Sequence, residues 1–251
     1  MFLSVWHTLF FDPIYNGLVY FIDVVPHGDV GLAIVLITIV VKLILLPLSL
    51  KAARTQLIMR EIEPQLKELK EKFKDKREEQ AKAMMDIYKV AGVNPFSSIA
   101  LLFIQIPIVI ALYLSVARGG GISFPEINTA LLYSFVPTPE HVSMLFFGIL
   151  DIGAKNLPLA LIAGITQFIH THLSLPPKTP RDKDAKPNFK DDLAHSMQMQ
   201  MRYVMPVIIF FVAYTISAAI ALYFTISNLM AIGQEYIVRR KGLKHIPNEH
   251  V

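Results

Sequence analysis

The sequence predicts an all-α polytopic membrane protein in which five transmembrane helices surround a hydrophilic groove. Three observations favour this class. The 251 residues are 53% hydrophobic and only 18% charged, which is too apolar a balance for a water-soluble domain. Several apolar stretches are long enough to cross a bilayer, and the basic residues gather between them. The chain contains no cysteine, which excludes a disulfide-stabilised scaffold.

The apolar stretches define the expected spans, because a helix needs about 20 residues to cross the roughly 30 Å hydrocarbon core. The last apolar block, residues 203–238, is too long for one crossing, and we expect it to reverse at the small residues Ser217, Ala218 and Ala219. The reversal leaves a short fourth span of about 15 residues, which implies local thinning of the bilayer. The expected transmembrane helices are residues 30–50, 95–117, 157–174, 202–216 and 217–238.

Positive charge is distributed very unevenly along the chain. Of the 24 Lys and Arg residues, 11 lie in residues 51–92, six in 178–202 and four in 239–244, whereas the first 29 residues contain none. The positive-inside rule therefore places the N-terminus outside and the C-terminus in the cytoplasm, which requires an odd number of crossings. The net charge of +4 therefore reflects mainly the basic residues of the cytoplasmic segments, and no specific nucleic-acid target is expected. The connecting segments are an extracytoplasmic loop at 118–156, a cytoplasmic loop at 175–201 and a cytoplasmic tail at 239–251.

Residues 1–29 are predicted to form an extracytoplasmic amphipathic helix lying on the outer leaflet. Asp12 followed by Pro13 is typical of a helix start, with the carboxylate as N-cap and proline at the first helical position. The N-terminus lacks the basic region and small-residue cleavage site of a secretory signal, so we do not expect its removal. A sixth crossing here would conflict with the charge distribution. The apolar residues expected on one face are Ile14, Leu18, Phe21, Ile22 and Val25.

Lys42 is the one charged residue inside the first span and lies near its middle. A lysine at this depth costs about 2.5–3.5 kcal/mol on translocon scales, so it should face a wet cavity or a partner rather than lipid. The alternative is that its long stem carries the ammonium toward the interface. Thr38, one turn earlier, and Gln105 in the second span are candidates to line the same polar cavity, although such groups also serve as ordinary interhelical hydrogen-bonding partners.

Residues 51–94 are predicted to form a helical hairpin that projects into the cytoplasm. Apolar residues recur at helical spacing, and the pattern breaks around residues 74–76 before resuming. Pro64 indicates a bend or a helix start. The charged surface of this hairpin suits either solvent or a docking partner. The first stripe comprises Ile58, Ile62, Leu66, Leu69 and Phe73.

No motif of covalent or metal-dependent catalysis is present. The chain lacks HExxH, GxSxG and a Walker loop, and it has no pair of intramembrane aspartates. His170 and His172 are two residues apart on a predicted helix and point in different directions, so we expect no metal site. The sequence therefore favours neither an enzyme nor a cofactor-dependent protein.

Four stretches together resemble the YidC/Oxa/Alb membrane-protein insertases. The NP…IQIPI…ALY and MPVI…LY…SNL signatures, in this order around a charged hairpin, are specific to that family. The resemblance extends over nearly the whole chain. Within the family, the chain is similar to the short five-span bacterial members, which have no large extracytoplasmic domain. The stretches are GLAIVLITIVVKLILLPLSLKAARTQ at 31–56, VNPFSSIALLFIQIPIVIALY at 93–113, LIAGITQF at 161–168 and MPVIIFFVAYTISAAIALYFTISNL at 205–229.

This resemblance implies a non-enzymatic insertase and chaperone of the bacterial inner membrane, with a groove open to the cytoplasm and lipid but closed on the outer side. Family members use a groove arginine, and the matching position here is Lys42, which keeps the charge but loses the planar fork. Thr38 and Gln105 match other groove positions. A substrate-contacting apolar slide would fall on the second and fourth spans, including Ile104, Ile108, Met205 and Phe210.

The partners implied by the resemblance are nascent membrane proteins and the phospholipid bilayer, with the ribosome and the Sec translocon beside them. Two other classes of function compete with this interpretation. A small transporter or channel could use Lys42 as an anion site, but it should contain internal repeats with broken helices, and we find no convincing repeat. An intramembrane enzyme would need an acid, a base or a nucleophile that the spans lack.

Overall fold

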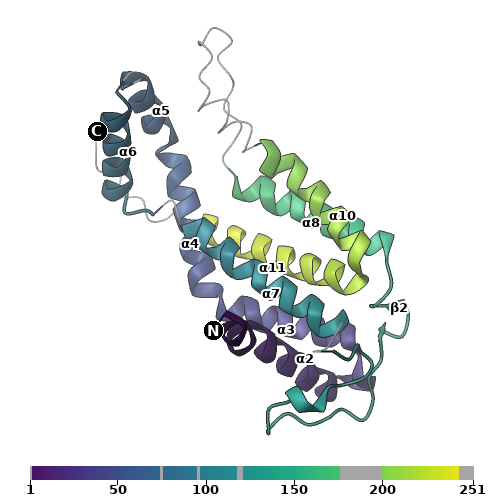
Figure 1. Cartoon of the computed structure of the whole chain (residues 1–251). Coiled ribbons are helices and arrows are strands. Elements are labelled where there is room, and N and C mark those ends of the chain that lie inside the picture. The colour runs from purple at the N-terminus through teal and green to yellow at the C-terminus, as the bar shows by residue number, and fades with distance from the viewer. Residues whose placement is uncertain (1, 74–75, 95–96, 118–120, 176–198, 243–251) are drawn as a thin grey trace.

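The computed structural model of the chain describes residues 2–73, 76–94, 97–117, 121–175 and 199–242 (Figure 1). Most of these residues are helical, which confirms the predicted all-α class. The helices are α1 Phe2–Trp6, the π-helix η1 His7–Phe11, α2 Asp12–Val24, the 3₁₀-helix η2 Pro26–Gly28, α3 Val30–Ile44, α4 Leu46–Glu61, α5 Glu63–Lys72, α6 Arg77–Val90, α7 Ser97–Ala117, the 3₁₀-helix η3 Thr129–Leu131, α8 Leu157–Ser174, the π-helix η4 Gln200–Val204, α10 Met205–Ile216 and α11 Ala218–Gly242.

Helix α11 is the centre of the bundle. It packs against α3, α8 and α10. Helix α2 packs on α3 and α7 (Figure 1). The main apolar core fills the space between α2, α3, α7 and α11. A second core between α8, α10 and α11 consists of small residues, which lets these three backbones approach closely. Its buried members are Ala160, Ala163, Ala213 and Ala221.

The first expected span, residues 30–50, is not one straight helix. Helix α3 ends at Ile44 and α4 begins at Leu46, with a bend of 65° between them. Pro47 lies in the first turn of α4, where its missing N–H and its ring interrupt the hydrogen bonding of a continuous helix. Helix α4 packs against α7 and α11 and then leads the chain toward α5 and α6 (Figure 1).

By length and hydropathy, no single helix within the described residues suffices to cross a membrane. The bent pair Val30–Ile44 and Leu46–Glu61 suffices only when the two helices are taken together. Helix α8 has the bounds of the third expected span, and α7 spans Ser97–Ala117; residues 95–96 of the second expected span lie outside the described residues. The predicted reversal is present, since extended Ser217 separates α10 from α11.

Within the described residues, each of the two π-helical turns ends two residues before a proline. Asp12 donates its backbone N–H to the carbonyl of His7, and Met205 donates to Gln200, in each case five residues back. Pro13 and Pro206 follow at once. A π turn rearranges the hydrogen bonds next to a residue that cannot donate one, so the helix continues through the proline.

The N-terminal helix differs from its prediction in two respects. Helix α2 begins at Asp12, but Phe11 before it is already helical, so Asp12 is not an N-cap and instead pairs with His7 at 3.0 Å. The predicted apolar face exists, but it is largely buried against α3 and α7 rather than turned toward lipid. Tyr20 and Val24 on the other side of α2 are exposed.

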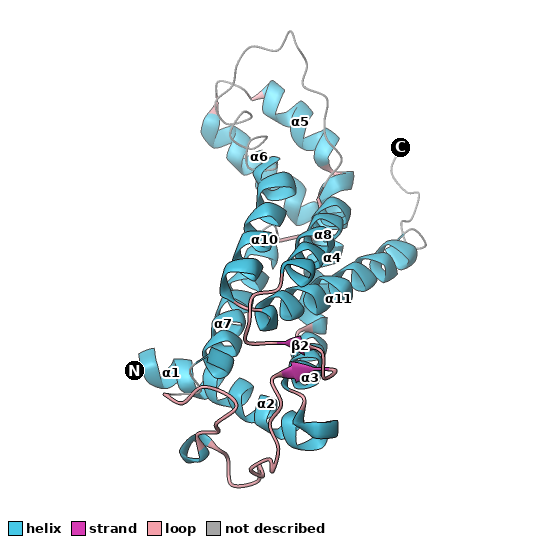
Figure 2. Cartoon of the chain, turned by 90° about the vertical axis from the view of Figure 1, so that its right-hand side faces the viewer, coloured by secondary structure: helices cyan, strands magenta, loops and turns pink. Residues whose placement is uncertain are grey.

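Helices α5 and α6 pack against each other within the segment expected to form a hairpin, and Pro64 lies in the first turn of α5. Residues 74 and 75 of the expected break at 74–76 lie outside the described residues. The segment 121–156 contains a small antiparallel sheet that the sequence analysis did not predict (Figure 2). Its strands are β1 Leu145–Phe146 and β2 Leu150–Asp151.

Candidate functional site

Lys42 occupies the last turn of α3, just before the bend into α4. Its side chain is half-buried, and its ammonium donates a hydrogen bond to the side-chain oxygen of Gln105 on α7 at 3.4 Å. In the described part of the chain, no salt bridge joins Lys42 to a carboxylate. The structure thus places two of the predicted groove residues in direct contact and leaves the positive charge without a counterion there.

Tyr223 on α11 extends this contact to a third helix. The amide nitrogen of Gln105 donates a hydrogen bond to the Tyr223 hydroxyl. Tyr223 is only 2% exposed. Sequence reasoning missed Tyr223, although a tyrosine in an apolar helix needs a partner for its hydroxyl and so signals a polar contact. Lys42, Gln105 and Tyr223 form a polar line across α3, α7 and α11.

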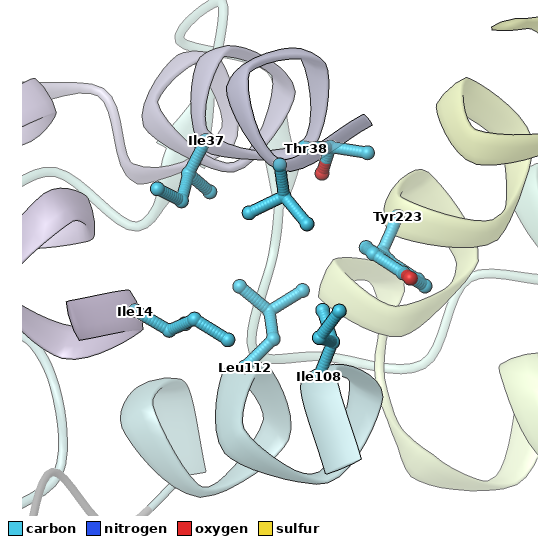
Figure 3. A pocket seen from close by; sticks show the side chains of 7 residues that line it. Ile14, Ile37, Thr38, Ile108, Leu112 and Tyr223 are labelled. Atoms are coloured by element: carbon cyan, nitrogen blue, oxygen red, sulfur yellow. The ribbon is translucent and has the colours of Figure 1, made fainter. Parts of the chain in front are cut away.

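Thr38 lies beside this polar line rather than in it. Its buried hydroxyl donates to the carbonyl of Ile34 at 2.6 Å, so its hydrogen-bonding capacity as a donor is used within α3. Thr38 lines a small pocket in which Tyr223 supplies the other polar side chain (Figure 3). The remaining lining residues are apolar: Ile14, Ile37, Val41, Ile108 and Leu112.

The four predicted slide residues fall into two separate groups. Ile108 is buried in the main core and Ile104 packs against that core from α7. Met205 and Phe210 lie on α10, and Phe210 packs against the alanine core beside Gly164 of α8. Ile104 and Ile108 therefore belong to a different apolar core from Phe210. The strongly exposed apolar side chains of these helices are neighbours of the predicted ones: Phe103, Ile106 and Ile110 on α7, and Val207, Ile208 and Phe211 on α10.

A second basic group, which the sequence analysis did not single out, lies where α8 ends. The guanidinium of Arg60 on α4 donates to the carbonyl oxygens of Leu173 and Leu175, the latter at 2.5 Å. Arg239 on α11 also donates to Leu173 and is paired with Glu235 at 3.1 Å. Burial and the neighbouring Arg239 lower the pKa of Arg60. Carbonyls at a helix C-terminus carry partial negative charge, which explains why arginines gather there.

His170 on α8 is within electrostatic range of Lys42, and its buried Nδ1 has no hydrogen-bond partner among the described residues. Over those same residues, no cluster of three or more His, Asp or Glu side chains could hold a metal ion. What the site offers chemically is therefore a cation and neutral polar groups enclosed by apolar helices. Such a set can solvate and attract an anionic group, but it contains no nucleophile with an adjacent base.

Comparison with known proteins identifies the family. A model of the family described as "60Kd inner membrane protein" matches residues 21–245. The chain belongs to this family. The match spans most of the chain, which confirms the resemblance found in the motifs, and it includes all three residues of the polar line.

Curated relatives named "Membrane protein insertase YidC" align over most of this chain. The protein of Pelobacter propionicus is 30% identical over 235 residues, covering 94% of this chain and 39% of its own length. That of Clostridium tetani is 29% identical over 224 residues, covering 89% and 88%. That of Oceanobacillus iheyensis is 28% identical over 242 residues, covering 94% and 84%. The chain thus spans less than half of the Pelobacter relative but most of the other two.

Proposed function

We propose that this protein is a non-enzymatic insertase of the bacterial inner membrane that transfers nascent membrane proteins into the bilayer. The observation that carries the proposal is the uncompensated cation Lys42, hydrogen-bonded to Gln105 inside a bundle of apolar helices. Family membership and the names of the relatives point to the same activity. The family is also the reason for placing the protein in the inner membrane.

The proposed arrangement has five crossings with the N-terminus outside. It is supported by the segment 143–156, which touches the starts of three helices. Ser143 pairs with Val30 at the start of α3, Asn156 caps α8, and the carbonyls of Ile152 and Ala154 accept from the first residues of α11. Three alternate helices therefore begin at one end of the bundle, as expected when the chain crosses five times. The 65° bend then lets α4 leave the membrane toward the cytoplasmic hairpin.

In the proposed mechanism, the polar part of a substrate that must cross the membrane resides transiently near Lys42. Moving an acidic group from water into hydrocarbon is strongly unfavourable. A hydrated cation lowers this free-energy barrier, because it attracts the acidic group and takes the place of part of its hydration shell. The short η4–α10 element is compatible with a thinned bilayer, which shortens the same path. The step requires neither a covalent intermediate nor a nucleotide.

The apolar part of the substrate leaves sideways along α7 and α10. We keep Ile104, Ile108, Met205 and Phe210 as the proposed slide and extend it to the exposed neighbours Phe103 and Val207, because an emerging segment meets exposed side chains first. The cytoplasmic hairpin of α5 and α6 is the proposed site of first capture. Ribosome and Sec translocon are the proposed partners at the cytoplasmic side.

The test is complementation in cells depleted of their own insertase. Insertion of a small single-span protein with an acidic translocated tail is followed by protease protection. The wild-type chain should restore insertion, Lys42→Arg should retain it, and Lys42→Ala should reduce it for acidic tails but not for neutral ones. Lys155→Ala, at an exposed lysine outside the groove, is the matched control. No rescue by well-expressed wild-type protein would overturn the proposed function. Wild-type insertion rates for acidic tails with Lys42→Ala would contradict only the proposed role of the groove charge.

A further inference from the structure

The small sheet ends in a strongly apolar tip. β1 and β2 pair antiparallel, and the residues between them are Phe147, Gly148 and Ile149. Phe147 is 66% exposed and Ile149 is 87% exposed. Exposing large apolar side chains to water is unfavourable in free energy. Their exposure at a loop tip therefore indicates that another surface covers them.

The tip is held in a strained conformation. Phe147 has a φ of 51°, in the left-handed region that bulky residues rarely adopt. Its backbone N–H donates to Oδ2 of Asp29 at 2.7 Å, while Oδ1 of the same carboxylate caps α3 through Leu32 at 3.0 Å. Asp29 is only 5% exposed. One buried carboxylate thus ties the outward-turned tip to the first turn of α3, and such strain persists only where the surroundings enforce it.

The base of the hairpin is fixed as firmly as the tip. The ring of Phe146 lies directly over Gly31, where a Cβ would come within 2.4 Å of the ring. On the other side, Ile152 donates to Met144 at 2.8 Å and accepts from Ala219 at the start of α11 at 3.0 Å. The hairpin is therefore a rigid projection at the end of the bundle where α3 and α11 begin (Figure 2).

We propose that the tip formed by Phe147 and Ile149 inserts into the outer leaflet and anchors this end of the bundle at the lipid surface. The inference rests on the proposed five-span arrangement, which puts the starts of α3, α8 and α11 at the outer surface. The bilayer is favoured as the occupant because the tip is fixed at the first turn of α3, the level at which that helix enters the membrane. Exposed apolar side chains of α2, Tyr20 and Val24, lie on the helix packed against α3 and continue the apolar character of this end.

The absence of cysteine from the natural chain makes single-cysteine labelling direct. Ile149→Cys, Glu140→Cys and Val207→Cys are each labelled with a polarity-sensitive fluorophore in the full chain, reconstituted in lipid nanodiscs. Iodide quenches labels in water, and lipids brominated near the carbonyl end of the acyl chains quench labels in the leaflet. Glu140 is an exposed control in the same loop, and Val207 is an exposed residue of α10 that reports whether the bundle lies in the bilayer.

We expect the label at position 149 to be quenched by the brominated lipids and not by iodide. The label at position 140 should be quenched by iodide and not by the brominated lipids. Lipid quenching at 207 combined with iodide quenching at 149 equal to that at 140 would overturn the anchor and leave the insertase arrangement intact. Protection of 149 from both quenchers would indicate a protein partner and would also overturn it. Absence of lipid quenching at 207 would overturn the five-span arrangement and, with it, this inference.

Discussion

The ammonium of Lys42 on α3 and the amide oxygen of Gln105 on α7 are joined by a 3.4 Å hydrogen bond. These residues lie 63 positions apart in the chain, so the contact is tertiary. The amide can donate to Tyr223 while accepting from Lys42, and it satisfies both neighbours without cancelling the charge. A glutamine here therefore orients the lysine and leaves its charge available.

Gln105→Glu should reduce the insertion of substrates with acidic translocated tails about as strongly as Lys42→Ala does. A carboxylate about 4 Å from the ammonium attracts it by roughly 4 kcal/mol at an effective dielectric constant of 20, and this attraction competes with the substrate. The measurement is protease protection of matched acidic and neutral substrates in insertase-depleted cells. Gln105→Leu, which removes the amide but keeps the free cation, is the control. Wild-type rates with Gln105→Glu for acidic substrates would contradict the role of the charge.

Arg60→Ala should loosen the end of α8. The substitution leaves the carbonyls of Leu173 and Leu175 without their shared donor, and hydrogen bonds from charged groups contribute about 1.5–3 kcal/mol. We expect amide hydrogen exchange of a peptide covering residues 171–175 to accelerate by roughly tenfold or more. Lys67→Ala, at an exposed basic residue of α5, should leave this exchange unchanged. Equal exchange in both variants would show that Arg239 alone holds the helix end.

Gly164→Leu should destabilise the contact between α8 and α10. A Cβ at Gly164 would lie 3.0 Å from Cβ of Phe210 and 3.4 Å from the carbonyl oxygen of Pro206. Overpacking of this kind costs about 1–3 kcal/mol, so thermal unfolding in detergent should shift to lower temperature. Gly233→Leu is the matched control, because a Cβ at Gly233 meets nothing within 4 Å. The prediction fails if the two variants unfold at the same temperature.

Asn16→Leu should separate α2 from the loop that covers it. The buried Asn16 amide donates to the carbonyls of Asp12 and Leu131, and its oxygen accepts from the N–H of Tyr133 at 2.6 Å. Each buried group left without a partner costs about 1–3 kcal/mol. The single tryptophan, Trp6, belongs to the same N-terminal region, so its fluorescence should report a lower unfolding midpoint. The Thr129→Val variant, at an exposed residue, should keep the wild-type unfolding midpoint. A wild-type midpoint for Asn16→Leu would contradict the role of Asn16 in holding α2 to this loop.

Several elements were predictable because their signals are local. The reversal at Ser217, the bounds of α8 and the start of α5 next to Pro64 follow from small residues, apolar length and proline placement. The π turns before Pro13 and Pro206 were not predictable, because a proline in an apolar run is equally compatible with a kink, a helix start or a π turn. The 65° bend after Lys42 was missed because apolar residues continue through Pro47.

The sequence by itself determined the helical class, the likeness to an insertase family and the position of one isolated cation in an apolar stretch, because these depend on composition, order and local spacing. Only the tertiary structure decided what Lys42 contacts, that Tyr223 completes its polar line, and that Asp29 holds the hairpin tip at the start of α3. The physical reason is that the bundle helices α3, α7, α8 and α10 are apolar on most faces. Their periodicity therefore carries little information about which face meets which neighbour, and packing alone selects the partners.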